Sequence, residues 1–155
     1  MICELWWAST FIEKLNFDTI DLRRLESSFR FRGNTLNWIA SYLLHREQYV
    51  KCGSSASRVD PVVHGVPQGS VLGPILFTLY IAPLASVINS FGVSHHQYAD
   101  DTQLYIAISK ADCIQKLHLA ESCLSSVCEW LSLNYLAINP DKSEAILLGT
   151  WQQLA

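Results

Sequence analysis

Apolar side chains recur at helical spacing in two segments of the first third of the chain. In residues 21–31, leucine and phenylalanine return every three or four positions among arginines and a glutamate, and Gly33 follows as a helix stop signal. Residues 34–43 carry a second apolar stripe, which Asn34 or Thr35 can cap. The pattern predicts two helices joined as a hairpin.

A β-hairpin and a long helix are predicted next. Residues 48–52 and 59–66 are rich in strand-forming side chains and are separated by a glycine-serine turn at residue 53. After a loop, an apolar stretch that Ser70 can cap predicts one helix as far as residue 88.

The last third of the chain repeats the alternation of strand and helix. Residues 93–98 and 102–108 predict a hairpin whose tip is Ala99-Asp100-Asp101. An amphipathic helix opens at Asp112, and a final strand follows at residues 144–148. One face of that helix carries Leu117, Ala120, Leu124, Val127 and Leu131. Several antiparallel strands packed against helices indicate the α+β class.

Residues 61–99 contain no Asp, Glu, Lys or Arg, and their most apolar part, residues 71–88, approaches the length of a membrane span. A helix buried in a protein core is the other interpretation. Gly73, Pro74 and Pro83 interrupt the stretch and no basic cluster flanks it, so we favour the core and expect no membrane partner.

Composition excludes disorder, because 50% of the residues are hydrophobic and 16% are charged. At 155 residues we expect one core. The net charge of −3 argues against tight binding of a polyanion, since affinity for phosphate backbones comes largely from Lys and Arg.

Five cysteines without a Cys-x-x-Cys pair fit a reducing compartment, and the first nine residues lack the features of a signal peptide. We therefore expect an intracellular protein, in the nucleus or the cytoplasm. Cys113, His118, Cys123 and Cys128 resemble a zinc set, but steps of five residues scatter them around a helix. We expect free, mostly buried thiols instead.

The adjacent carboxylates of Asp100 and Asp101 suggest a metal site, because two negative groups side by side are unfavourable unless a cation neutralises them. Surface turns are also rich in aspartate, so this pair by itself is weak evidence and fits an ordinary turn better than a metal site.

The neighbouring sequence favours the metal site. Residues 65–77 are Gly-Val-Pro-Gln-Gly-Ser-Val-Leu-Gly-Pro-Ile-Leu-Phe, and residues 97–102 are Gln-Tyr-Ala-Asp-Asp-Thr. Together they resemble the reverse transcriptases of non-LTR retrotransposons, particularly jockey-like elements. The resemblance covers about residues 17–148 and includes Trp38, Ser41, Tyr42, Leu43, Arg46, Gln48, Val50, Trp130, Leu131, Asn134, Leu136, Asn139, Lys142, Ser143 and Glu144.

This resemblance implies a polymerase palm with incomplete fingers and no thumb. Asp100 and Asp101 match the positions that hold Mg²⁺, Asp100 directly and Asp101 less directly. In two-metal nucleotidyl transfer, one ion activates the primer 3′ hydroxyl and the other holds the triphosphate. The implied partners are an RNA template, a DNA primer and deoxynucleoside triphosphates.

The resemblance also assigns substrate-binding and proton-transfer residues. Lys142 matches a lysine proposed to protonate departing pyrophosphate, although a solvated pair with Asp141 fits the sequence equally well. The resemblance implies that Phe17 screens the sugar 2′ position of the substrate. It implies that a loop packs against the templating pair, formed by Pro67, Gln68 and Gly69. Tyr98 is the remaining implied substrate-binding residue.

One catalytic position departs from the family pattern. If Phe17 is the screening aromatic, a third carboxylate is expected five residues earlier, where this chain has Ile12. Glu13 would point to the opposite face of a strand, and Asp18 matches another family position. We therefore expect the chain as it stands to be inactive.

The expected organisation is an unmatched leader at residues 1–16, a palm fragment at 17–149 and a tail at 150–155, without most of the fingers and thumb. Three functions compete: a polymerase, active or formerly active; a non-catalytic remnant that binds nucleic acid or protein; and a small membrane protein built around residues 71–88. The missing third carboxylate indicates that the chain now acts, if at all, as a non-catalytic remnant. The Tyr-Ala-Asp-Asp motif nevertheless indicates that it derives from the polymerase family.

Overall fold

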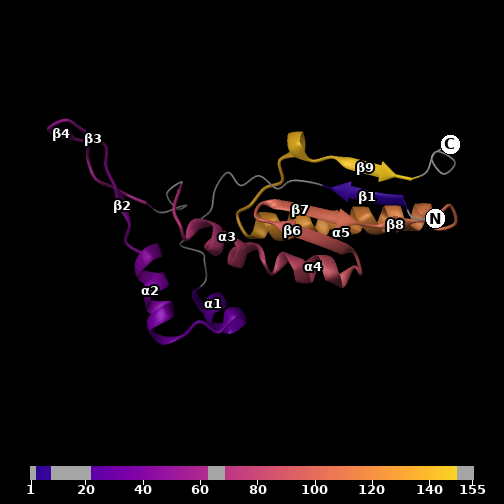
Figure 1. Ribbon diagram of the computed structural model, residues 1–155, viewed down its shortest axis with the longest axis horizontal. Coiled ribbons are helices and arrows are strands. Elements are labelled where there is room, and N and C mark those ends of the chain that lie inside the picture. Colours follow the sequence, from indigo (N-terminus) through magenta and orange to yellow (C-terminus); the bar gives the residue numbers. More distant parts are fainter. Residues whose placement is uncertain (1–2, 8–21, 63–68, 150–155) are drawn as a thin grey trace. The chain divides into compact units, whose positions relative to one another are not determined.

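The computed structural model of the chain describes residues 3–7, 22–62 and 69–149 (Figure 1). These residues belong to two compact units, where we expected one core. The smaller unit comprises residues 14–73, and the larger unit comprises residues 1–13 and 74–155. Small antiparallel sheets and helices make up the fold, which is a mixed α/β structure.

Two helices of the smaller unit confirm the predicted helical hairpin. They are α1 (Leu22–Phe29) and α2 (Gly33–Leu43), and each buries part of its apolar stripe. Gly33 was predicted to stop the first helix, but it begins the second. The left-handed residue after α1 is Arg30, with φ of 58°, and the Phe31 N–H closes the helix end by donating to the Leu25 carbonyl at 3.1 Å.

The rest of the smaller unit is a nested hairpin. β2 (Glu47–Gln48) pairs with β5 (Asp60–Pro61), and between them β3 (Lys51–Cys52) pairs with β4 (Ser55–Ala56). Gly53 is the first of two loop residues and has φ of 60°, which suits a type II′ turn. This tight turn starts the returning strand at residue 55, earlier than the predicted 59.

The larger unit contains the predicted carboxylate hairpin. β6 (Ser94–Tyr98) pairs with β7 (Asp101–Tyr105) along its whole length. After one residue the chain continues as β8 (Ala107–Ile108), which pairs with β1 (Cys3–Trp7), and β1 pairs in turn with β9 (Ala145–Leu148). The strands predicted at 93–98, 102–108 and 144–148 are therefore confirmed to within a few residues, and Figure 1 shows β1 lying between β8 and β9.

The single helix predicted over residues 70–88 is wrong, because proline divides it. α3 (Gly73–Ile81) ends before Pro83, which lacks an N–H and instead precedes the first turn of α4 (Leu84–Ser90). The start of the helix agrees with the sequence, since the Ser70 hydroxyl accepts the Gly73 N–H at 3.1 Å.

Of the described residues, those from 73 to 90 form a segment long and apolar enough to cross a membrane. The Tyr80 hydroxyl, however, donates to the Asn134 carbonyl at 2.5 Å and ties α3 to the C-terminal end of α5 (Cys113–Leu133). Buried side chains of the segment are Leu76, Phe77, Tyr80, Ile81, Leu84 and Ile88. This packing favours the core interpretation over a membrane span.

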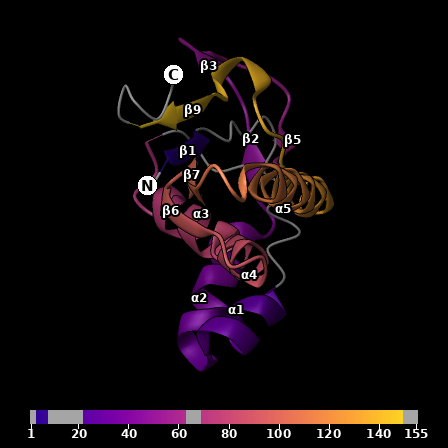
Figure 2. The same ribbon diagram turned by 90° about the vertical axis from the view of Figure 1, so that its right-hand side faces the viewer.

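α5 (Cys113–Leu133) confirms the predicted amphipathic helix and packs beside α4 and β8; Figure 2 shows α5 almost end-on. The hydroxyl and N–H of Ser109, both bonded to Asp112 Oδ1, lower the pKa of that carboxyl just before the helix. Val127 and Leu131 of the predicted stripe are buried, and so is Cys123. The expectation of mostly buried thiols is wrong for the other described cysteines, because Cys113 is half-buried and Cys52 and Cys128 are exposed. Burial raises the pKa of the Cys123 thiol.

Candidate active site: a carboxylate hairpin

The β6–β7 turn is tight and strained. Tyr98 pairs with Asp101, so the loop consists of Ala99 and Asp100 alone. Ala99 has φ of 53°, a conformation that costs an L-residue roughly 1–2 kcal/mol and that glycine usually provides. Such strained positions concentrate at functional sites. The conformation of Ala99 sets the position of the backbone from which the Asp100 side chain extends.

The strand register divides the hairpin into two faces, because directly opposite residues of an antiparallel pair lie on the same face. Thr102 and Leu104 of β7 are buried, whereas Asp101 is exposed. Tyr98, opposite Asp101, is 76% exposed. The tip therefore presents Tyr98 and one carboxylate on the outward face, with the half-buried Asp100 in the turn.

A polar pair lies on the core face just below the tip. Gln97 and Thr102 are opposite each other in the register, one pair in from Tyr98 and Asp101. Gln97 Nε2 and Thr102 Oγ1 are both buried, and neither has a hydrogen-bond partner among the described residues. A buried polar atom without a hydrogen-bond partner destabilises the folded state. Gln97 and Thr102 therefore make the layer beneath the carboxylates polar, where apolar side chains would stabilise the fold more.

The described residues offer a metal ion two carboxylates at this tip. Within residues 22–62 and 69–149, His, Cys, Asp and Glu side chains do not gather in any group of three or more that could hold a metal. Mg²⁺ is commonly held by one or two carboxylates together with waters and substrate phosphates. The chemistry of Asp100 and Asp101 therefore fits a weak Mg²⁺ site that substrate phosphates would complete.

The second motif singled out in the sequence is described from Gly69 onward. Gly69 has φ of 82°, so this loop position favours glycine. Ser70 connects the loop to α2, because its hydroxyl lies 2.5 Å from the Tyr42 hydroxyl in addition to accepting the Gly73 N–H. The loop end is thus held by a contact between residues 28 apart in the chain.

Several predicted site residues lie outside the described residues. These are Ile12, Phe17, Pro67 and Gln68, so the site that Gln68 was expected to share with Asp100 stays a prediction. Lys142 is described, and it lies in a short 3₁₀ helix (Pro140–Lys142) between α5 and β9 of the larger unit. Its role as a general acid stays a prediction.

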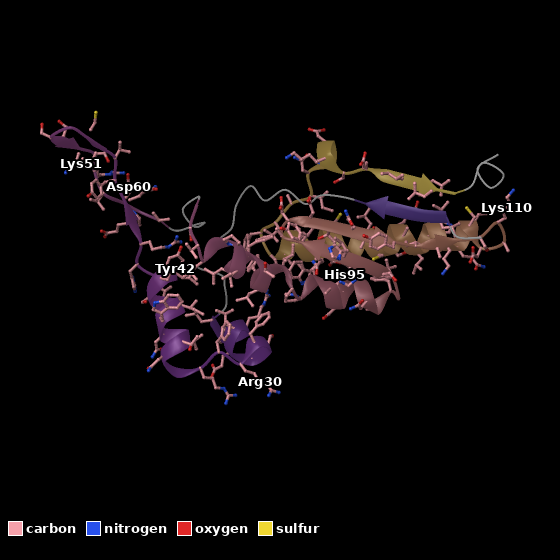
Figure 3. All side chains as sticks on the ribbon, in the orientation of Figure 1. Arg30, Tyr42, Lys51, Asp60, His95 and Lys110 are labelled. Carbon is pink, nitrogen blue, oxygen red and sulfur yellow. The ribbon has the colours of Figure 1, made fainter. Side chains whose placement is uncertain are left out.

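The outward face of the hairpin carries side chains that we had not considered. His96 lies opposite Gln103, and the Tyr105 hydroxyl donates to Gln103 Oε1 at 2.6 Å. Figure 3 labels His95, which points to the other face because neighbouring strand residues alternate. Counting outward from Asp101 in steps of two would have found this row from the sequence.

Comparison with known proteins completes the description of the site. The family model described as reverse transcriptase (RNA-dependent DNA polymerase) matches residues 4–153. The probable RNA-directed DNA polymerase from transposon BS of Drosophila melanogaster is 31% identical over 111 residues, 68% of this chain and 12% of the relative. The RNA-directed DNA polymerase from mobile element jockey of the same organism is 33% identical over 69 residues, 41% of this chain and 8% of the relative. The aligned part of the chain thus spans about a tenth of each relative.

Proposed function

This chain belongs to the reverse transcriptase family, and from that premise we propose that it is palm sequence of a non-LTR retrotransposon polymerase. The proposed reaction is RNA-templated addition of deoxynucleotides to a DNA primer. The observation that carries the proposal is the Tyr98-Ala99-Asp100-Asp101 turn, which places two carboxylates at the tip of an antiparallel hairpin.

Reverse transcriptases use Mg²⁺, which supplies activation of the primer hydroxyl and neutralisation of phosphate charge. In this chain Asp100 and Asp101 would hold the metal. The strained Ala99 orients the Asp100 carboxylate, and the hairpin register keeps Asp101 on the solvent side. Lys142 is proposed to donate a proton to the leaving pyrophosphate.

The remaining proposed roles concern substrate. Phe17 would exclude a 2′ hydroxyl, and Pro67, Gln68 and Gly69 would pack against the templating base pair, where glycine permits close backbone approach. Tyr98, exposed beside Asp101, would contact the primer end. Ile12 stands where the family has its third carboxylate, so we propose that the chain is inactive until that ligand is supplied.

RNA-templated primer extension tests the proposal. Residues 17–149 would replace the aligned segment of the transposon BS polymerase, which leaves the host's own sequence at the first carboxylate position. We expect this graft to extend a primer in Mg²⁺ and to stop in EDTA. If the graft of residues 17–149 is soluble and folded but does not extend the primer, the proposal of a functional carboxylate hairpin is contradicted.

The contact between Tyr42 and Ser70 yields a prediction about the substrate loop. In the graft, Tyr42→Phe should raise the KM for deoxynucleotide about fivefold with little change in kcat. The reason is that one hydrogen bond contributes about 1 kcal/mol to holding the loop, and the loop is proposed to bind rather than react. Steady-state kinetics would measure both constants.

Tyr49→Phe is the matched control, because Tyr49 is an exposed tyrosine of the same unit and should leave the KM unchanged. The double variant Ser70→Ala, Tyr42→Phe should raise the KM no more than Ser70→Ala alone does, since both substitutions remove the same hydrogen bond. A fully additive double variant would show that the Tyr42 hydroxyl does not act through Ser70.

A non-catalytic nucleic-acid-binding remnant is the second candidate, and the charge distribution supports it. Residues 14–73 contain eight Lys and Arg against five Asp and Glu, whereas residues 1–13 and 74–155 contain three against nine. The overall charge of −3 therefore conceals a basic smaller unit and a strongly acidic remainder. Binding of a polyanion is therefore expected on the smaller unit.

A further inference from the structure

A pocket on the smaller unit is lined chiefly by arginine. It has a volume of about 670 Å³ and is bordered by Arg23, Glu26, Ser27, Arg30 and Arg32. Arg23, Glu26 and Ser27 lie at spacings of three and one along α1, so they share one face of that helix, and Arg30 and Arg32 lie between α1 and α2. Three guanidinium groups against one carboxylate make this pocket a site of net positive charge.

Two of these arginines occupy positions that local backbone chemistry disfavours. Arg30 has φ of 58°, where glycine or asparagine is the usual residue. Arg32 is the N-cap of α2, with no side-chain cap bond among the described residues, and it places a cation at the positive end of the helix dipole. Violations of local rules by neighbouring residues are typical of functional positions.

A backbone hydrogen bond and a pair of aromatic rings hold the turn that carries Arg30 and Arg32. The Phe31 N–H donates to the Leu25 carbonyl at 3.1 Å, and the rings of Phe29 and Phe31 lie 6.4 Å apart. Both rings are half-buried, whereas Arg30 and Arg32 are exposed. Figure 3 shows Arg30 at the outer end of α1, projecting away from the helices. The guanidinium groups are therefore held at the surface on an ordered turn.

We propose that Arg30 and Arg32, with Arg23 beside them, form a binding site for phosphodiester groups of a nucleic-acid backbone. Guanidinium is the side chain that best matches a phosphate, because its donors can bond two oxygens at once. The choice of nucleic acid over other polyanions rests on the proposed polymerase function. Contacts to phosphate position the strand and do not read its sequence.

Binding of single-stranded oligonucleotides to the whole chain tests this site. The probes are fluorescein-labelled oligo(U) and oligo(dT) of equal length, measured by anisotropy over a range of NaCl concentrations in EDTA. The variant is Arg30→Gly with Arg32→Asn, which removes both charges while introducing residues that suit a left-handed position and an N-cap. Its Tm should therefore equal or exceed that of the wild type.

We expect the double variant to bind both oligonucleotides about tenfold more weakly, with a salt slope smaller by about 1.4, as loss of two phosphate contacts on a single strand predicts. Arg30→Lys with Arg32→Lys should keep the salt slope, since the charges remain. Lys51→Gln with Arg58→Gln is the matched control, because it removes two exposed charges from the hairpin of the same unit. Figure 3 shows Lys51 at the opposite end of that unit from Arg30.

Equal weakening by the pocket and control pairs would overturn the site, because net charge would then explain the binding. Unchanged affinity in the Arg30→Gly, Arg32→Asn variant would overturn it as well. If the Arg30→Gly, Arg32→Asn variant loses binding to phosphatidylserine vesicles but keeps binding to the oligonucleotides, the site binds a membrane surface instead. Neither metal nor triphosphate is present, so the outcome is independent of whether the carboxylate hairpin is catalytic.

Discussion

Ile12→Asp should raise primer extension by several orders of magnitude in a graft that carries residues 4–153 of this chain in the transposon BS polymerase. The physical reason is that the family's third carboxylate binds the same metal ions as Asp100, and every tenfold gain corresponds to about 1.4 kcal/mol of activation free energy. Extension rates on an RNA template would measure the gain, with the unmodified graft as reference.

The shorter graft of residues 17–149 separates this explanation from a folding defect. If Ile12 is the defect, the short graft is active, the long graft is inactive, and the substitution restores the long graft. Equally strong extension by the long graft with Ile12 in place would mean that the first motif is aligned wrongly. Glu13 or Asp18 would then be the third ligand.

Asp100→Asn should abolish that gain, with a loss on the order of a thousandfold or more in the Ile12→Asp graft. An amide keeps the shape of the side chain but removes the charge that binds Mg²⁺ and substrate phosphate. Asp101→Asn should cost less, because Asp101 is proposed to coordinate less directly. Single-turnover extension would separate this loss from slow product release.

Glu129→Gln is the matched control for the Asp100 prediction, since Glu129 is an exposed carboxylate on α5 of the same unit. It should leave extension within about twofold, as surface substitutions away from special features usually do. If Asp100→Asn kept a tenth or more of the activity, the hairpin carboxylate would not be a metal ligand.

Much of the fold was predictable because local patterns and tertiary packing agree there. The β6–β7 hairpin alternates buried and exposed side chains in step with its sequence, and α5 buries Val127 and Leu131 from the predicted stripe. Cys123, which is 0% exposed, agrees with the expectation of buried thiols, whereas Cys52 and Cys128 are exposed, because a thiol is too small and too weakly polar to mark a core position in the sequence.

The errors arise where one residue outweighs a long pattern. Pro83 lacks the N–H that a continuous helix over residues 70–88 needs; we counted it against a membrane span but not against one continuous helix. Gly53 permits a two-residue turn, which moved the strand pairing toward the turn. Arg30 adopts a left-handed conformation that sequence reasoning assigns to glycine, so the boundary between α1 and α2 was placed at Gly33.

The carboxylate pair of the candidate site could be predicted, but the structure that supports it could not. Asp100 and Asp101 are adjacent in sequence, so their proximity needs no tertiary information. The contact between Tyr42 and Ser70 joins residues 28 apart, and the unpartnered Gln97 and Thr102 atoms follow from strand register. Neither feature leaves a local signal in the sequence.

Binding of Mn²⁺ by the 155-residue chain would test the central claim most directly, because Mn²⁺ suits the same oxygen ligands as Mg²⁺ and broadens nearby amide NMR signals. We predict selective broadening of the signals of residues 98–102 with weak, millimolar affinity, displaced by Mg²⁺ and lost in Asp100→Asn with Asp101→Asn. Broadening centred elsewhere, or unchanged by that double substitution, would contradict a metal-binding carboxylate hairpin.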